Sequence, residues 1–125
     1  MSNVKGLPPP GLGSDLTKTL LEKIRKMGQR QIIYTEHALD KMNAESEMIT
    51  FEEVRDVVVE GEIIEDYPED VRGHSCLMLG ITRSGRPVHV VCAPKERYLG
   101  IITVYVPSKM KWKKGFKTRE TGRSN

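Results

Sequence analysis

The sequence predicts an α+β domain in which N-terminal helices pack on one face of an antiparallel sheet of four or five strands. Apolar residues recur at helical spacing up to Gly61 and at strand spacing after it. Proline and glycine then divide the second half of the chain into short segments, as is typical of strands and their turns. The chain has 125 residues, 38% of them hydrophobic and 30% charged, which suits one domain with a single modest core.

The first predicted helix begins after Ser14, whose hydroxyl can cap it, and ends at Gly28. Four apolar residues at helical spacing form its buried face: Leu16, Leu20, Ile24 and Met27. A short apolar strand over residues 32–34 follows. The chain therefore reaches the sheet once before its main strands begin.

Two further helices are predicted from the residues that cap them. Thr35 caps the second helix, and the run from Thr50 to Glu53 is a capping box at the start of the third. Gly61 ends the third helix. The residues expected to face the core from these two helices are Ala38, Leu39, Met42, Val54, Val57 and Val58.

Four strands are predicted after Gly61, and turn residues separate them. Pro68 ends the first strand and Pro107 ends the last. Ser84-Gly85 is typical of a two-residue hairpin turn between the middle pair. The predicted strands cover residues 62–67, 74–82, 87–93 and 99–106.

A two-residue turn at 84–85 sets the register of the hairpin and places His89 opposite Gly80. One face of the sheet is then fully apolar and is predicted to be the core beneath the helices. Its members are Leu77, Leu79, Ile81, Val88, Val90, Cys92, Ile102, Val104 and Val106. The reverse face carries His89, Thr103 and Tyr105 among small neighbours. We expect that face to be open and to form a shallow site.

Cys76 and Cys92 are the two cysteines of the chain. In the same register Cys76 lies opposite Ala93 and Cys92 opposite Leu77, so the two sulfurs point to opposite sides of the sheet and cannot bond. Buried free thiols are therefore expected. Two cysteines cannot complete a zinc site, and we expect neither a metal nor a cofactor.

The net charge of +3 hides a strong separation of charge along the chain. Residues 36–70 hold thirteen Asp and Glu against Lys41 and Arg55, a net charge of −11. Residues 95–125 hold nine Lys and Arg against two Glu, a net charge of +7. The acidic segment is interpreted as a solvated face, or as a surface for a protein partner or a second copy in a homodimer. The basic segment indicates RNA, because cations neutralise phosphates and its aromatic residues can stack on bases.

The chain divides into a flexible Pro/Gly-rich leader over residues 1–13, one α+β domain over 14–106 and a basic tail over 107–125. No apolar run approaches the roughly 20 residues needed to cross a bilayer, and the leader lacks an apolar signal core. We therefore expect a cytoplasmic protein with no membrane partner.

Several separate motifs carry a family resemblance, and they occur in order over roughly residues 30–120. They are YTEHALDKM, TFEEVRDVVVEGEIIEDYPED, CLMLG-x-T-x-x-GRPVHVVCA and IITVYVPS-x-x-x-W-x-x-x-F-x-x-R. In these motifs the chain resembles a bacterial family of domains of unknown function, grouped with the RelE- and BrnT-like toxins and with the fold of barnase and colicin nucleases. The resemblance implies a toxin of a toxin–antitoxin pair, inhibited by a zinc-finger, helix-turn-helix antitoxin of the MqsA/YgiT type.

The tail departs from this family pattern, which is often acidic around the tail tryptophan. Here that tryptophan, Trp112, is surrounded by Lys109, Lys111, Lys113 and Lys114. The departure predicts that this tail holds polyanion, or a more acidic partner, more strongly than its relatives do.

Two groups of residues are predicted to act on RNA. The catalytic candidates, able to move protons or stabilise a phosphorane, are His37, His89 and Tyr105. His37 follows a helix start, where the helix dipole disfavours the charged imidazole. The candidates for holding phosphate or base are Arg72, Arg86, Lys111, Trp112 and Arg119.

Each candidate has a structural alternative. His37 can pack or cap its helix, and a helix or the tail can cover His89 and Tyr105. Trp112 can anchor the tail by packing, and Arg86 can be the exposed end of a hairpin. The leading hypothesis is a metal-independent endoribonuclease toxin, and its main alternative is a non-catalytic module that binds RNA or protein. A DNA-binding regulator is a weaker hypothesis, because no helix carries a pattern of base-reading residues.

Overall fold

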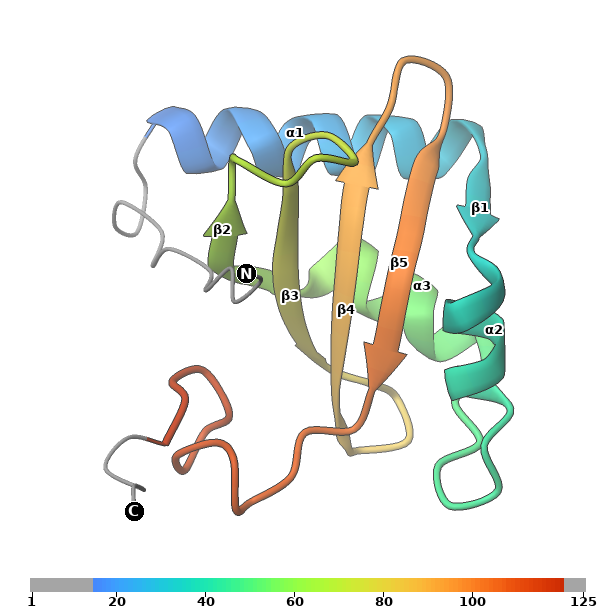
Figure 1. The fold of residues 1–125 in the computed structure, drawn as a ribbon, viewed down its shortest axis with the longest axis vertical. Helices are drawn as coiled ribbons and strands as arrows, with labels where there is room; N and C mark the ends of the chain where they lie inside the picture. The colour runs from blue at the N-terminus through green and yellow to red at the C-terminus, as the bar shows by residue number, and fades with distance from the viewer. Residues whose placement is uncertain (1–14, 121–125) are drawn as a thin grey trace.

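A five-stranded sheet with strand order β1-β5-β4-β3-β2 lies at the centre of the fold (Figure 1). The computed structural model describes residues 15–120, and within them three helices accompany the sheet. The elements are α1 (Asp15–Arg30), β1 (Ile32–Tyr34), α2 (Glu36–Met42), α3 (Phe51–Glu60), β2 (Glu62–Tyr67), β3 (Ser75–Ile81), β4 (Pro87–Pro94) and β5 (Leu99–Tyr105). The predicted α+β class is confirmed. The expected cap at Ser14 and the leader lie outside the described residues.

The sheet is mixed rather than purely antiparallel as predicted. Strands β2 to β5 form an antiparallel meander, and β1 adds to the free edge of β5 in parallel. Gln31 and Thr35, at either end of β1, hydrogen-bond to Leu99 and Ile101 of β5. Helix α1 spans from the β2 side of the sheet to its β1 edge, and β1 follows it directly (Figure 1).

The caps of α2 and α3 were predicted correctly, because each depends on residues close together in the chain. Thr35 Oγ1 accepts a hydrogen bond from the Ala38 backbone at 3.0 Å. Thr50 and Glu53 form the predicted capping box, and Gly61 caps the end of α3. Helix α1, by contrast, continues past Gly28 to Arg30.

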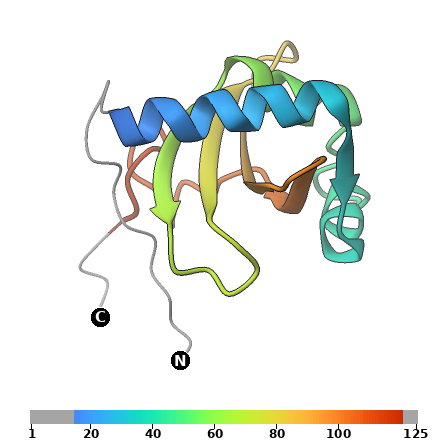
Figure 2. The same ribbon diagram turned by 90° about the horizontal axis from the view of Figure 1, so that it is seen from above.

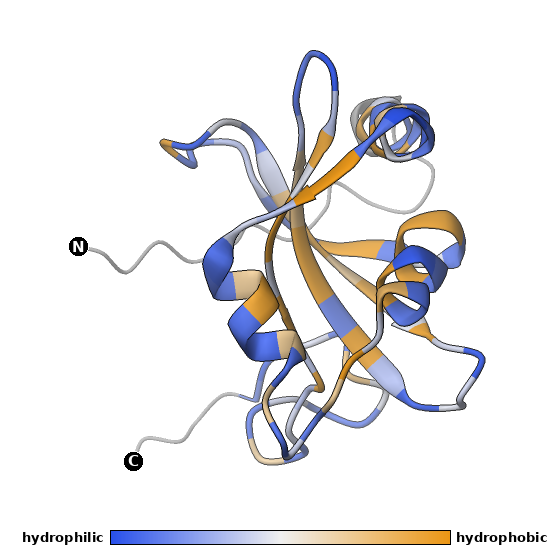
Figure 3. Cartoon of the chain, turned by 90° about the vertical axis from the view of Figure 1, so that its right-hand side faces the viewer, coloured by the Kyte–Doolittle hydropathy of each residue, from blue (hydrophilic) through white to orange (hydrophobic). Residues whose placement is uncertain are grey.

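Helices α1 and α3 cover one face of the sheet, and α2 lies at its β1–β5 edge (Figure 2). Apolar residues run along the strands between these layers (Figure 3). The largest fully buried side chains of this main core are Ile24, Val54, Val57, Val58, Met78, Val88, Val90, Leu99, Ile101 and Val104. The opposite face of the sheet therefore has to be covered by other segments or exposed to solvent.

The register of the β3–β4 hairpin differs from the prediction by one residue. The loop has three residues, 83–85, because Thr82 already pairs with Arg86 through a backbone hydrogen bond of 3.0 Å. Gly85 has φ +89°, the left-handed conformation that such loops require. His89 therefore lies opposite Leu79 and not opposite Gly80.

This shift moves every β3 side chain to the other face of the sheet. Gly80 lies beneath α3, where an added Cβ would be only 2.9 Å from Val57 Cα. Leu77 and Leu79, predicted in the main core, belong to a second apolar cluster on the reverse face. A bulge between β4 and β5 similarly moves Ile102 out of the main core.

Cys76 and Cys92 lie directly opposite each other on the same face, so the prediction that their sulfurs diverge was wrong. Both are nevertheless buried free thiols, as expected. The Cys92 thiol donates a weak hydrogen bond to the Met78 sulfur at 3.9 Å. The neighbouring Cys92 thiol, followed by burial, raises the pKa of the Cys76 thiol well above its usual range.

The tail, up to residue 120, packs on the reverse face of the sheet. Trp112 is buried in the second apolar cluster against Ile64, Leu77 and Leu79, and Phe116 packs beside it. A β-bridge between Trp112 and Arg119 closes the tail into a loop. The expectation that this whole face is open was therefore wrong: the tail covers one part of it and leaves another exposed.

Candidate functional site

The uncovered part of the reverse face is a groove of about 580 Å³. Strands β4 and β5 form its floor, the start of α2 forms one wall, and the β2–β3 loop forms the other. That loop projects from the side of the sheet opposite α1 (Figure 2). The residues that line the groove are Thr35, His37, Tyr67, Glu69, Asp70, Val71, Arg72, Val91, Ile102 and Thr103.

His37 is the exposed imidazole of this groove. Its Nε2 forms a hydrogen bond of 3.0 Å with Thr103 Oγ1 on β5. Thr35 fixes the start of α2, since its hydroxyl donates to the Ile102 carbonyl at 2.9 Å and also caps the helix. Two hydrogen bonds to one strand thus hold the imidazole over the groove. The prediction that Thr103 lies on the reverse face is confirmed.

Arg72 enters the groove from the β2–β3 loop, which Asp70 organises. The Asp70 carboxylate accepts hydrogen bonds from Arg72 Nε at 3.0 Å and Nη2 at 2.9 Å, and from the Ser75 hydroxyl at 2.6 Å. The guanidinium holds the pKa of Asp70 at about 2, despite partial burial that opposes this shift. The Arg72 side chain remains 59% exposed. With two of its five N–H donors engaged, others remain for an anion.

The groove has no excess of positive charge, because two carboxylates accompany its single arginine. Asp70 balances Arg72, and Glu69 adds a negative charge to the same wall. Tyr67 donates its hydroxyl to Glu65 at 2.5 Å, and burial, followed by this carboxylate, raises its pKa above the usual range. Arg72 can therefore orient a phosphate, but the groove has no net positive charge with which to attract a polyanion.

Asp70 and Tyr67 were not predicted as site residues from the sequence. The sequence did contain a signal for this turn, in the run Asp70-Val71-Arg72-Gly73. In many turns an aspartate side chain accepts a hydrogen bond from the backbone N–H two residues later. That bond forms here, from Arg72 N to Asp70 at 2.9 Å. Gly73 completes the turn with φ +109°.

His89 does not face solvent, because the tail lies over it. Its side chain is fully buried, with the Trp112 ring 4.4 Å away and edge-on. Nε2 donates to the Phe116 carbonyl at 2.8 Å, and the Tyr105 hydroxyl lies 3.2 Å from Nδ1. A carbonyl can only accept, so the hydrogen of the neutral ring is on Nε2 and Tyr105 donates to Nδ1.

Burial also determines how these two rings titrate. It lowers the pKa of His89 to about 4 and raises that of Tyr105 to about 12. Near pH 7 the imidazole is neutral and the phenol is protonated, and each satisfies the other. The structural alternative foreseen for this pair, coverage by the tail, is the one that the structure adopts.

Arg119 and Trp112 hold the tail in place. Arg119 makes two hydrogen bonds to Glu65, at 2.7 and 2.9 Å, and its guanidinium lies 4.7 Å from the Trp112 ring centroid. The Glu65 carboxylate raises the pKa of Arg119 above its already high value. Both residues, predicted to contact RNA, here join the tail to β2.

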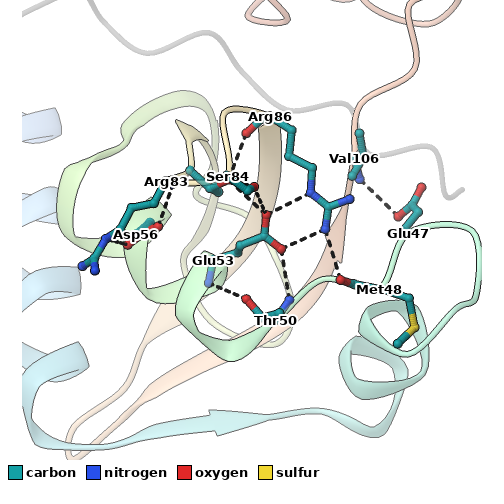
Figure 4. A network of polar contacts seen from close by, with 10 residues as sticks. Glu47, Met48, Thr50, Glu53, Asp56, Arg83, Ser84, Arg86 and Val106 are labelled. Carbon is teal, nitrogen blue, oxygen red and sulfur yellow. Dashed lines mark hydrogen bonds and ion pairs between the residues drawn. The ribbon is translucent and has the colours of Figure 1, made fainter.

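Arg86 is likewise engaged within the protein and is not an idle hairpin end (Figure 4). It binds both oxygens of Glu53, at 2.9 and 2.8 Å, and donates to the Met48 carbonyl at 3.1 Å. Glu53 also accepts from Ser84 at 2.7 Å and Thr82 at 3.0 Å. Arg86, more than any other partner, lowers the pKa of Glu53 to about 2. The network ties the hairpin loop to α3.

Lys111, predicted to hold phosphate, is exposed on the tail loop together with Lys109, Lys113 and Lys114. Lys117 is also exposed and forms an ion pair of 2.9 Å with Glu62. Within residues 15–120, no group of three or more His, Cys, Asp or Glu side chains is arranged to hold a metal ion. Over the same residues, no helix has both the length and the apolar character to span a membrane.

The structure thus defines an α+β protein with a mixed sheet and a groove that joins His37 to Arg72. Of the predicted site residues, these two are brought together, and the others lie in or beneath the tail or in the Glu53 network. The chain belongs to the family described as Domain of unknown function (DUF4258), whose model matches residues 34–106, more than half of the chain. No curated protein and no solved structure matches it.

Proposed function

We propose that this protein is the toxin of a type II toxin–antitoxin pair and cleaves RNA without a metal ion in the His37 groove. The observation that carries the proposal is the exposed His37 imidazole, held by Thr103 at 3.0 Å in the groove that Arg72 also lines. A proton-transfer group beside an anion-binding group is the minimum that phosphodiester cleavage requires.

The chemistry uses the ribose as nucleophile. His37 takes the proton of the 2′-hydroxyl, and O2′ attacks the adjacent phosphorus while Arg72 stabilises the charge that develops on the phosphorane oxygens. The bond from phosphorus to O5′ then breaks, and the leaving oxygen takes a proton from solvent or from the protonated imidazole. The products are a 2′,3′-cyclic phosphate and a 5′-hydroxyl.

RNA affinity is assigned to the tail, because the groove itself has no excess of positive charge. Lys111 and its exposed neighbours lie on the loop that covers the same face of the sheet as the groove. The sequence resemblance to RelE- and BrnT-like toxins supports the toxin assignment. It further suggests a zinc-finger, helix-turn-helix antitoxin of the MqsA/YgiT type as partner, and the cytoplasm as the place of action.

His37→Ala tests this function, with His74→Ala as a matched control. His74 is also exposed and pairs with a carboxylate, Asp66 at 2.5 Å, but does not line the groove. We expect His37→Ala to lower the cleavage rate by about 100-fold or more, since general acid–base groups contribute about that much. His74→Ala should cleave like the parent.

The measurement is induced expression of the protein in cells, followed by sequencing of new RNA ends. RNA with a 5′-hydroxyl end is recognised because it must be phosphorylated before an adaptor can be ligated to it. The purified protein should cleave equally well with and without a chelator. Growth arrest and new ends that persist in His37→Ala would contradict the proposal, as would cleavage that a chelator abolishes.

A second candidate function, a non-catalytic RNA- or protein-binding module, is favoured by a specific observation. His89, Tyr105, Trp112 and Arg119 all serve packing, whereas the tail lysines are exposed. A binding module would bind single-stranded RNA without producing new ends. It would tolerate His37→Ala and lose affinity when the lysines are reversed in charge.

A further inference from the structure

A second hollow, of about 320 Å³, lies between α2 and α3, away from the His37 groove. Its lining includes Leu39, Met42, Met48, Ile49, Phe51 and Glu52. Met42 and Ile49 are buried members of the main core, whereas Met48 is 59% exposed and Phe51 is 55% exposed. The hollow therefore has an apolar floor and two large apolar side chains at its rim.

The rim residue Met48 is held in a strained conformation. Its φ is +47°, which a non-glycine residue rarely adopts. Its N–H donates to Ala44 at 2.8 Å, and its carbonyl accepts from Arg86 at 3.1 Å (Figure 4). The Glu53–Arg86 network thus helps to hold the strained backbone of Met48, whose apolar side chain is exposed to solvent. Backbone strain of this kind is concentrated at binding sites.

Phe51 also lies at the rim and is held by an aromatic contact. Its ring meets Tyr34 edge-on, with centroids 4.9 Å apart. Exposed aromatic and methionine side chains around a small hollow are typical of surfaces that receive an apolar anchor from a partner.

The surface around the hollow is acidic. Asp40, Glu45 and Glu52 are exposed on the segments that form it, and Glu47 is half-buried beside Met48. Lys41, the cation of α2, is half-buried. An apolar side chain flanked by cations is the ligand that such a surface fits.

The tail loop of this same chain has that composition. Met110 is 84% exposed, and Lys109 and Lys111 flank it directly. A turn presents it, because Lys111 N and Trp112 N both hydrogen-bond to the Ser108 carbonyl, at 3.2 and 3.1 Å. Trp112, buried in the second cluster, anchors the turn to the sheet.

We propose that two copies of this chain associate, each inserting the Met110 turn of its tail into the α2–α3 hollow of the other. The α2–α3 connection and the tail lie toward the same end of the molecule (Figure 1). Two-fold symmetry can therefore form both contacts at once, and a reciprocal contact closes into a dimer and not a filament. Lysine–carboxylate pairs surround each apolar insertion. This inference is independent of the proposed ribonuclease activity.

Charge exchange between the two surfaces tests the dimer. One variant carries Lys109→Glu and Lys111→Glu, and the other carries Glu45→Lys and Glu52→Lys, all at exposed positions where folding should be unaffected. Sedimentation velocity over a range of concentrations should show a dimer for the parent, weakened by salt. Each variant alone should dimerise at least about tenfold more weakly, because like charges then meet in both contacts.

The decisive sample is an equimolar mixture of the two variants. In a reciprocal dimer, one contact of the mixed pair is the native one and the other has both charges exchanged, so the mixture should recover dimerisation. Met110→Ser should weaken the parent dimer without changing its net charge. A parent that stays monomeric, variants that dimerise like the parent, or a mixture that does not recover would overturn the proposal.

Discussion

The alternation of side chains along its strand predicts that His89 is exposed to solvent. In the folded chain it is buried, because Trp112 and Phe116 cover it. Burial keeps its pKa at about 4, below the value of about 6.5 that it has in the unfolded chain. Between these values the unfolded state binds more protons than the folded state. Stability contributed by His89 is therefore complete above about pH 6.5 and is lost as the pH falls toward 4.

We predict that lowering the pH from 7 to 5 costs about 2 kcal/mol of unfolding free energy through His89 alone. Urea unfolding of the parent and of His89→Gln at pH 7, 6 and 5 measures this, since the amide cannot titrate. The comparison cancels every group that both chains retain. Glu53 and Asp70, with pKa values of about 2, act mainly below pH 4.5 and stay outside this window. Equal slopes in the two proteins would assign the pH dependence to other groups.

At the scale of secondary-structure elements, what could be predicted depended on how far apart the determining residues lie. The caps at Thr35 and Thr50 involve residues three positions apart, and both formed as expected. The hairpin register depended on one residue of loop length, and Thr82 extended the ladder because Glu53 and Ser84 bind its hydroxyl. That contact spans 29 positions and has no local signature.

The candidate site was likewise predictable only where the residues that determine it are close together in the sequence. His37 and Arg72 were recognised as single residues, but the groove that joins them required the β2–β3 loop to fold across from α2. The Asp70 turn that holds this loop, and the burial of His89 beneath the tail, arise from packing between distant segments. Residue type alone could not show which of the predicted side chains would be free.

The tail packs against the sheet as part of the fold, and substitution of a single side chain tests this. Trp112→Ala should destabilise the protein by about 3 to 5 kcal/mol, because it leaves a cavity beside Leu77, Leu79 and His89. Imidazole NMR should then show the His89 pKa rising from about 4 toward its ordinary value as water enters. Trp112→Phe, which keeps a ring in the cavity, should lose less stability and retain a low His89 pKa. A destabilisation below about 1 kcal/mol for Trp112→Ala would mean that the tail is only loosely attached.

At the scale of the whole molecule, the basic tail has two competing uses. In the proposed ribonuclease its lysines hold RNA, and in the proposed dimer Lys109 and Lys111 face the partner's carboxylates. Both interactions depend on the charge of these lysines and use the same exposed loop. The RNA-bound state and the dimer therefore exclude each other wherever they use the same lysines. RNA binding should then dissociate the dimer by mass action.

We predict that a short single-stranded RNA converts the dimer into complexes with one protein each. Sedimentation velocity with a fluorescent RNA of about 12 nucleotides, within the usual span of a single-strand site, should show the dimer boundary diminish as the complex forms. The variant with Lys109→Glu and Lys111→Glu should bind this RNA more weakly and with a shallower salt dependence, since fewer counterions are released. RNA that binds the dimer without dissociating it would show that these lysines are not shared. The RNA would then lie in the His37 groove without these lysines, and dimerisation could not regulate access to it.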